Sequence, residues 1–99
     1  MIKVEVKKEK GKYTGVILGH AMYDDYGKDI VCSAASSIVT TTVNGILSLK
    51  KGSLSYMISK QGMNIKVLSD DNNTQILIQN MISLLKELEK NYKDNIQVK

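Results

Sequence analysis

The chain opens with apolar and charged residues in strict alternation. Ile2, Val4 and Val6 are each followed by a charged residue, and this period of two predicts a strand with one solvated face. A turn at Gly11 separates it from the segment 13–19, which is predicted as a second and more deeply buried strand. The two segments therefore form a predicted hairpin.

The pattern changes to a helical period after residue 29. Val31, Ala35 and Val39 recur at a spacing of four, and Asp29 is a suitable N-cap, so a helix is predicted over 30–50. The second half of that segment is rich in β-branched residues, and its Asn44 and Gly45 favour a hairpin turn. In this second half, the local pattern favours a helix and a hairpin about equally.

The rest of the chain predicts a second hairpin, a second helix and a short last strand. Alternating apolar residues flank a turn at 61–62: Leu54, Tyr56 and Ile58, then Met63, Ile65 and Val67. Six apolar residues then share one helical face: Leu77, Met81, Leu84, Leu85, Leu88 and Tyr92. Ile96 and Val98 indicate the final strand. The order β-β-α-β-β-α-β predicts one domain over 1–99, an α+β two-layer sandwich with two helices on one face of a mostly antiparallel sheet.

Composition narrows the class of protein. Of the 99 residues, 42% are hydrophobic, which is enough for one modest core. A domain of this size buries its surface only marginally, so dimerisation would help it. The net charge of +4 fits a partner such as RNA or the ribosome. Because the basic residues are spread along the chain, ordinary solubility explains this charge more simply.

The cysteine count and the apolar runs bear on location. One cysteine excludes an intrachain disulfide and indicates a reducing compartment or a functional thiol. The first ten residues contain no apolar stretch typical of a signal peptide. We also expect no apolar run near the roughly 20 residues that span a membrane. The predicted location is the cytoplasm, without membrane contact.

The residue types exclude several kinds of site. One histidine and one cysteine are too few for a zinc site without help from aspartates. No glycine-rich phosphate loop is present, and the absence of phenylalanine removes the stacking pattern of the commonest RNA-binding sheet domain. We therefore expect no metal and no cofactor.

Cys32 and His20 are the candidate catalytic residues. If Asp29 is the N-cap, Cys32 lies in the first turn of the helix, where the helix dipole and free amides stabilise a thiolate. The same amides can hold an oxyanion. His20 follows the second strand, so it can act as base on the thiol and as acid on a leaving amine. The simpler alternative is a cysteine that acts as a small core residue and a histidine on the surface.

Two neighbouring polar residues each have two interpretations. Asp29 caps the helix, or it orients His20 as the third member of a triad. Ser36 shares the helical face of Cys32. Its hydroxyl bonds back to the Cys32 carbonyl, or it contacts the substrate.

The segment between the two candidates is a possible gate. Gly19 and Gly27 bracket it, and Tyr23 and Tyr26 could close over a substrate. The simpler interpretation of both glycines is that they are turn residues.

At these residues the sequence resembles the ribosomal-processing cysteine protease family, known as Prp. The match rests on "GHA" at 19–21 and "G-x-DIVCSAAS" at 27–36. The resemblance implies a dyad of Cys32 as nucleophile and His20 as base, with Asp29 and Ser36 as further motif positions. It also favours a long first helix over the local hairpin signal.

The resemblance further implies a homodimer with a mobile loop over the site. The implied substrate is the twenty-seventh large-subunit ribosomal protein, which loses an N-terminal extension carrying an aromatic-rich stretch. Methionines and helix-facing isoleucines and leucines are the expected apolar pocket for that stretch. The alternative function is a non-catalytic basic α+β module that binds ribosomal RNA or a ribosomal protein, with salt-dependent binding.

Overall fold

The computed structural model describes residues 2–18, 30–59 and 62–99. Its elements follow the order β1 (Ile2–Glu9), β2 (Lys12–Leu18), α1 (Ile30–Leu49), β3 (Leu54–Ser59), β4 (Gly62–Val67), α2 (Asn72–Asn91) and β5 (Ile96–Val98). The predicted order β-β-α-β-β-α-β is confirmed.

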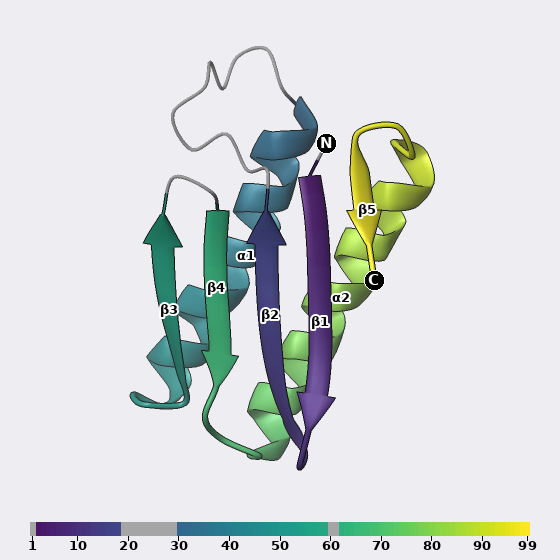
Figure 1. Ribbon diagram of the computed structural model, residues 1–99. Helices are drawn as coiled ribbons and strands as arrows, with labels where there is room; N and C mark the ends of the chain where they lie inside the picture. The colour runs from purple at the N-terminus through teal and green to yellow at the C-terminus, as the bar shows by residue number, and fades with distance from the viewer. Residues whose placement is uncertain (1, 19–29, 60–61) are drawn as a thin grey trace.

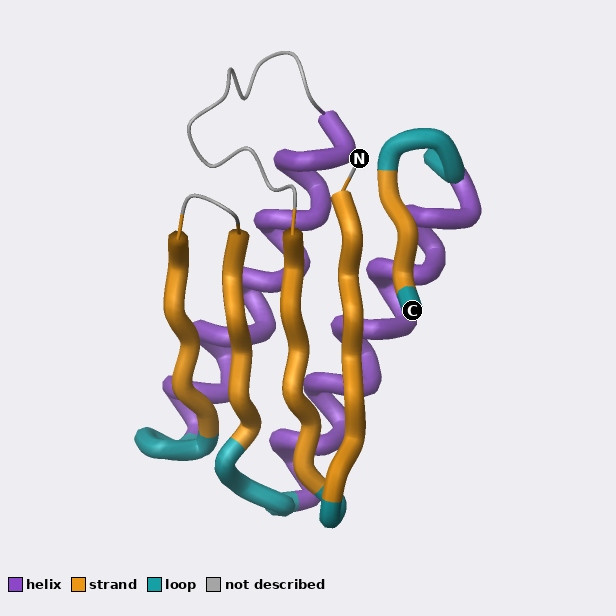
Figure 2. Tube along the Cα trace, in the orientation of Figure 1, coloured by secondary structure: helices purple, strands orange, loops and turns teal. Residues whose placement is uncertain are grey.

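The strands form one sheet in the order β3-β4-β2-β1-β5. Each strand is antiparallel to its neighbour except β5, which runs parallel to β1. Both helices cover the same face of the sheet (Figures 1 and 2). The protein is therefore the predicted α+β two-layer sandwich, and neither of the described helices covers the other face of the sheet.

The β1–β2 hairpin has a two-residue turn. Lys10 and Gly11 both have positive φ, 51° and 77°, while Glu9 pairs with Lys12. This is the pattern of a type I′ turn, whose twist matches that of the strands. The prediction that β2 is deeply buried is wrong, because only Ile17 of this strand is buried. Leu18 alternates with Ile17 and therefore lies on the sheet face opposite to α1 and α2.

α1 runs without interruption through Asn44 and Gly45, so the local hairpin signal is overridden. Six of its residues form a buried stripe: Val31, Cys32, Ala35, Val39, Val43 and Ile46. Burial of this stripe outweighs the modest helix propensity of the β-branched residues. The hydroxyls of Thr42 and Ser48 donate to the carbonyls of Ile38 and Asn44, at 2.8 and 2.7 Å, and so follow the helix.

By length and composition alone, α1 is long and apolar enough to cross a membrane. The expectation that no segment reaches this limit is therefore wrong. A single such helix is weak evidence, because the core helix of a water-soluble fold meets the same criterion. Here its apolar stripe belongs to the core shared with the strands.

The second helix buries a slightly different stripe from the predicted one. Thr74, Ile78, Met81 and Leu85 are buried. Leu84 and Tyr92 were predicted on this face, and both are about two-fifths exposed. α2 packs against α1 as well as beneath the sheet, so its buried face is set by two neighbours rather than one.

Candidate active site

Cys32 is the third residue of α1, and its side chain is only 3% exposed. It belongs to the core cluster that also contains Val31, Ala35 and Ile17. Packing of the α1 stripe therefore holds the thiol at a defined place at the start of the helix. Ile30, the first residue of α1, is 72% exposed and lies outside that stripe.

The start of α1 supplies electrostatic support for a thiolate. The first amides of any helix lack partners within the helix and carry its positive partial charge. No acidic residue lies in the first turn of α1 to oppose this field. Burial of the thiol acts in the other direction, since it disfavours the charged form. The arrangement can provide a nucleophile together with amide donors for an oxyanion.

β2 ends, and α1 begins, at the same end of the sandwich (Figure 1). The last residue of β2 is Leu18, and His20 follows two positions later in the sequence. The fold thus brings the strand that leads to the histidine to the end where the cysteine lies.

Several predicted site residues lie outside the described residues: Gly19, His20, Tyr23, Tyr26, Gly27 and Asp29. The Cys32–His20 contact, the Asp29 cap and the gate therefore stay predictions. Ser36 is described, one helical turn after Cys32 and partly buried. Its role also stays a prediction. In the described parts of the chain, no three histidine, cysteine or acidic residues form a group that could hold a metal ion.

Methionines contribute less to an open pocket than expected. Met63 and Met81 are buried in the core, at 7% and 3% exposure, and are closed to a substrate. Met57 in β3 is 68% exposed. Of these three methionines, Met57 alone remains available to contact another molecule.

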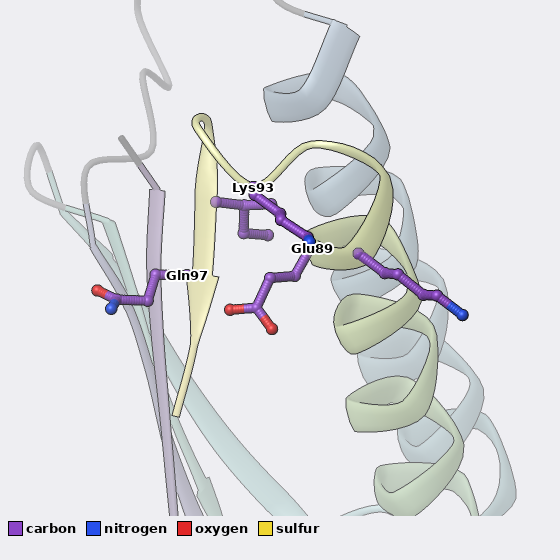
Figure 3. Close-up of a pocket in the computed structure, with 5 residues that line it drawn as sticks. Glu89, Lys93 and Gln97 are labelled. Atoms are coloured by element: carbon purple, nitrogen blue, oxygen red, sulfur yellow. The ribbon is translucent and has the colours of Figure 1, made fainter.

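A hollow of about 440 Å³ lies between α2 and β5, and Cys32 is not among the residues that line it (Figure 3). It is lined by Glu89, Lys90, Lys93, Ile96 and Gln97. Glu89 Oε2 accepts a hydrogen bond from the backbone N–H of Val98 at 2.7 Å. The carboxylate is thus engaged in holding the last strand, and the lining contains no cysteine, serine or threonine.

Sequence reasoning missed one residue near the site. Gly62 was assigned to a turn, but it is the first residue of β4 and pairs with Leu18 at the end of β2. Only its position beside another strand distinguishes it from an ordinary turn glycine. No local pattern could have identified it.

Comparison with known proteins identifies the family. A family model described as cysteine protease Prp matches residues 1–97. The chain belongs to the Prp family of cysteine proteases. The expected family and the expected class of enzyme are both confirmed.

Relatives of known name support this membership. The Prp ribosomal processing cysteine protease of Staphylococcus aureus is 34% identical over 103 residues, covering 99% of this chain and 97% of the relative. The Bacillus subtilis protein of the same name is 26% identical, covering 99% and 96%. A crystal structure of the S. aureus Prp protease with a covalently linked product peptide superposes with a TM-score of 0.85 at 29% identity, covering 99% of this chain and 97% of that chain.

Proposed function

We propose that this Prp family member is an endopeptidase that removes the N-terminal extension of the twenty-seventh large-subunit ribosomal protein, with Cys32 as nucleophile and His20 as general base and acid. The observation that carries this proposal is the place of the chain's single cysteine, in the first turn of α1. The family is one of cysteine proteases. The relatives' names refer to ribosomal processing, which supports a ribosomal substrate.

In the proposed mechanism, His20 accepts the thiol proton as Cys32 Sγ attacks the scissile carbonyl carbon. Amides at the start of α1 stabilise the oxyanion. The carbon–nitrogen bond then breaks, and His20 returns the proton to the departing amine. A water molecule, with His20 as base, attacks the thioester, releases the carboxylic acid and restores the thiol.

The supporting residues have narrower proposed roles. Asp29 caps α1 and orients His20, and its charge is then engaged with amides or imidazole rather than opposing the thiolate. Ser36 contacts the substrate from the next turn of α1. Tyr23 and Tyr26, between Gly19 and Gly27, close over the bound peptide.

The aromatic-rich stretch of the proposed substrate needs an apolar surface. Leu18 at the end of β2 and Ile30 at the start of α1 are 38% and 72% exposed, and β2 ends and α1 begins at the same end of the sandwich. Burial of apolar area in such contacts contributes about 25 cal/mol per Å². We propose that these two side chains form part of the substrate surface.

We further propose a homodimer that forms through the edge of β3. The segment Leu54–Ser59 contains no charged residue and no proline, the usual protections of an edge strand. Tyr56, Met57 and Ile58 are 47%, 68% and 48% exposed. An antiparallel two-fold pairing centred on Met57 places Tyr56 opposite Ile58 of the second copy, so that each apolar side chain meets another.

The proposed location is the cytoplasm, where a free thiol stays reduced. The catalytic proposal is tested by incubating the protein with a purified precursor ribosomal protein and measuring product masses. A single cleavage that depends on Cys32 is expected. No cleavage, together with salt-dependent RNA binding that is unaffected by Cys32→Ala, would instead support the non-catalytic module.

A further inference from the structure

One row of side chains crosses the outer face of the sheet, the face opposite to α1 and α2 (Figure 1). The register pairs Thr14 with Lys7 on one side and with Lys66 on the other. Lys66 pairs in turn with Ser55. Directly paired residues share a face of the sheet, and all four are exposed. These four residues, which we call the donor row, therefore run side by side across β1, β2, β4 and β3.

Every side chain of the donor row can donate hydrogen bonds, and none of them is acidic. Two are ammonium groups and two are hydroxyls. Neighbouring strands lie about 4.8 Å apart, so the backbones of Lys7 and Lys66, one on each side of β2, lie about 10 Å apart. No hydrogen bond or ion pair within the described parts of the chain engages any of these four side chains. Their donors are therefore available to a ligand that supplies acceptors and negative charge.

A hollow of about 400 Å³ adjoins the donor row. Its lining includes Thr14, Ser55 and Lys66 from that row, and Asn64 and Met57 beside it. Sites for small ligands begin at about 300 Å³. The row thus borders a space that can seat one group the size of a nucleotide.

A second row lies beside the donor row on the same face. The register pairs its members in the order Glu5, Val16, Asn64 and Met57. Met57 is 68% exposed and Val16 is partly exposed, so both offer apolar surface. The Asn64 amide donates and accepts hydrogen bonds, whereas the Glu5 carboxylate accepts them. This row suits a flat group with an apolar face and polar edges, such as a nucleic acid base.

The charges around the donor row leave it positive. Lys10 and Lys12 lie at the β1–β2 turn, and Glu9 pairs with Lys12 across the hairpin. The two connections at the β3 and β4 side offset each other, because residues 50–51 are both lysines and residues 70–71 are both aspartates. The fold thus gathers, on one face, lysines that lie far apart in the sequence.

We propose that the outer face of the sheet binds single-stranded RNA, with phosphates on the donor row and bases over the second row. Lys7 and Lys66 neutralise phosphates, and the hydroxyls of Thr14 and Ser55 bond to phosphate or ribose oxygens. Because these hydroxyls donate and accept, they can also pair with the ribose 2′-hydroxyl, which favours RNA over DNA. An acidic peptide would engage the lysines but would leave the apolar part of the second row without a matching group. The inference does not depend on the proposed cleavage.

The test measures binding of the full chain to a labelled single-stranded RNA of about 12 nucleotides by fluorescence anisotropy. We expect a Kd of about 1–100 µM that rises with salt. Lys7→Gln combined with Lys66→Gln should weaken binding about 25-fold near 0.1 M salt, or about 0.7 log unit for each lost phosphate contact. The matched control combines Lys86→Gln with Lys90→Gln on α2. It removes the same charge from the other layer and should weaken binding by less than about threefold.

Thr14→Val tests the donor row without changing its charge. It keeps the β-branched shape and removes one hydroxyl, so binding should weaken by about 2- to 10-fold while its salt dependence stays unchanged. DNA of the same sequence should bind more weakly than the RNA by a similar factor, because it lacks the 2′-hydroxyl. Equal affinity for the DNA would overturn the assignment to RNA.

Three further results would overturn the inference. The first is no RNA binding even at low salt, and the second is an equal loss in the donor-row pair and the α2 pair, which would reflect overall charge. The third is a polyglutamate peptide that binds as tightly as the RNA, which would assign the face to an acidic protein. Circular dichroism spectra that match the parent protein exclude unfolding of the variants. RNA binding without precursor cleavage would leave this inference intact and overturn the proposed function.

Discussion

The backbone N–H of Val98 donates a hydrogen bond of 2.7 Å to the carboxylate of Glu89, which joins β5 to the end of α2. The donor is therefore unavailable to an added strand at that edge of the sheet. The β3 edge, at the other side, consists of uncharged residues with three exposed apolar side chains. The β5 edge therefore has a backbone donor that is already engaged, whereas the β3 edge presents exposed apolar side chains without charges.

The Glu89 contact should stabilise the fold. Glu89→Ala leaves the Val98 N–H, in a partly buried site, without its charged acceptor, and such bonds contribute about 1.5–3 kcal/mol. We expect the free energy of unfolding in urea to fall by about that amount. Glu87→Ala on the exposed side of the same helix is the control and should change it by less than about 0.5 kcal/mol. Equal effects of the two variants would show that the hydrogen bond adds little.

Cys32 should be dispensable for folding and necessary for cleavage. Cys32→Ala and Cys32→Ser remove the nucleophile, while each fits the buried site at a cost of at most about 2 kcal/mol. We expect a native circular dichroism spectrum and no product of precursor cleavage by mass spectrometry. A Cys32→Ala protein with full activity would exclude the thiol mechanism.

The thiol should ionise more readily than an ordinary cysteine. Its place at the start of α1 favours the thiolate, so iodoacetamide should modify it with an apparent pKa below about 8.5. The measurement is the rate of alkylation against pH, followed by mass spectrometry. His20→Ala, which removes the proposed base, should move the midpoint upward. A midpoint at the ordinary value in the parent protein would indicate that burial dominates and that the cysteine is structural.

Gly45 offers a test of the continuous helix. A Cβ there meets no neighbouring atom, and the residue lies within α1, so Gly45→Ala should stabilise the protein by about 0.5–1 kcal/mol. Thermal unfolding should show a higher melting temperature. Gly52→Ala, at a positive φ of 82°, should lower it. A destabilising Gly45→Ala would mean that this segment bends as its local sequence suggests.

The β3 edge predicts where a dimer forms. Met57→Lys places a charge at the centre of the proposed two-fold pairing, and burial of an unpaired charge is costly. We expect sedimentation to show a shift from dimer to monomer at concentrations where the parent protein is dimeric. Ile76→Lys, at a 53% exposed site on α2, is the control and should leave the dimer intact. If Ile76→Lys alone gives the monomer, the interface lies on the helix layer.

Much of this protein follows from its sequence. Alternation in β1 and β4 identifies strands whose local pattern and tertiary environment agree, and the period of α2 identifies that helix, although not all of its buried residues. The order of these elements leads to the two-layer fold, and the motif around Cys32 leads to the family. Each of these signals lies within a short stretch of chain, where residue spacing directly reflects which side chains share a face.

Other features depend on contacts between distant residues. The path of α1 through Asn44 and Gly45 is decided by burial of its stripe in the core, which outweighs local turn propensity. Which apolar residues of α2 are buried, and that Leu84 is 39% exposed, depends on where α1 and β5 contact this helix. The lack of room for a side chain at Gly62 comes from the Ile17 carbonyl, far away in sequence. Local spacing carries no information about such neighbours, because only the folded arrangement brings them together.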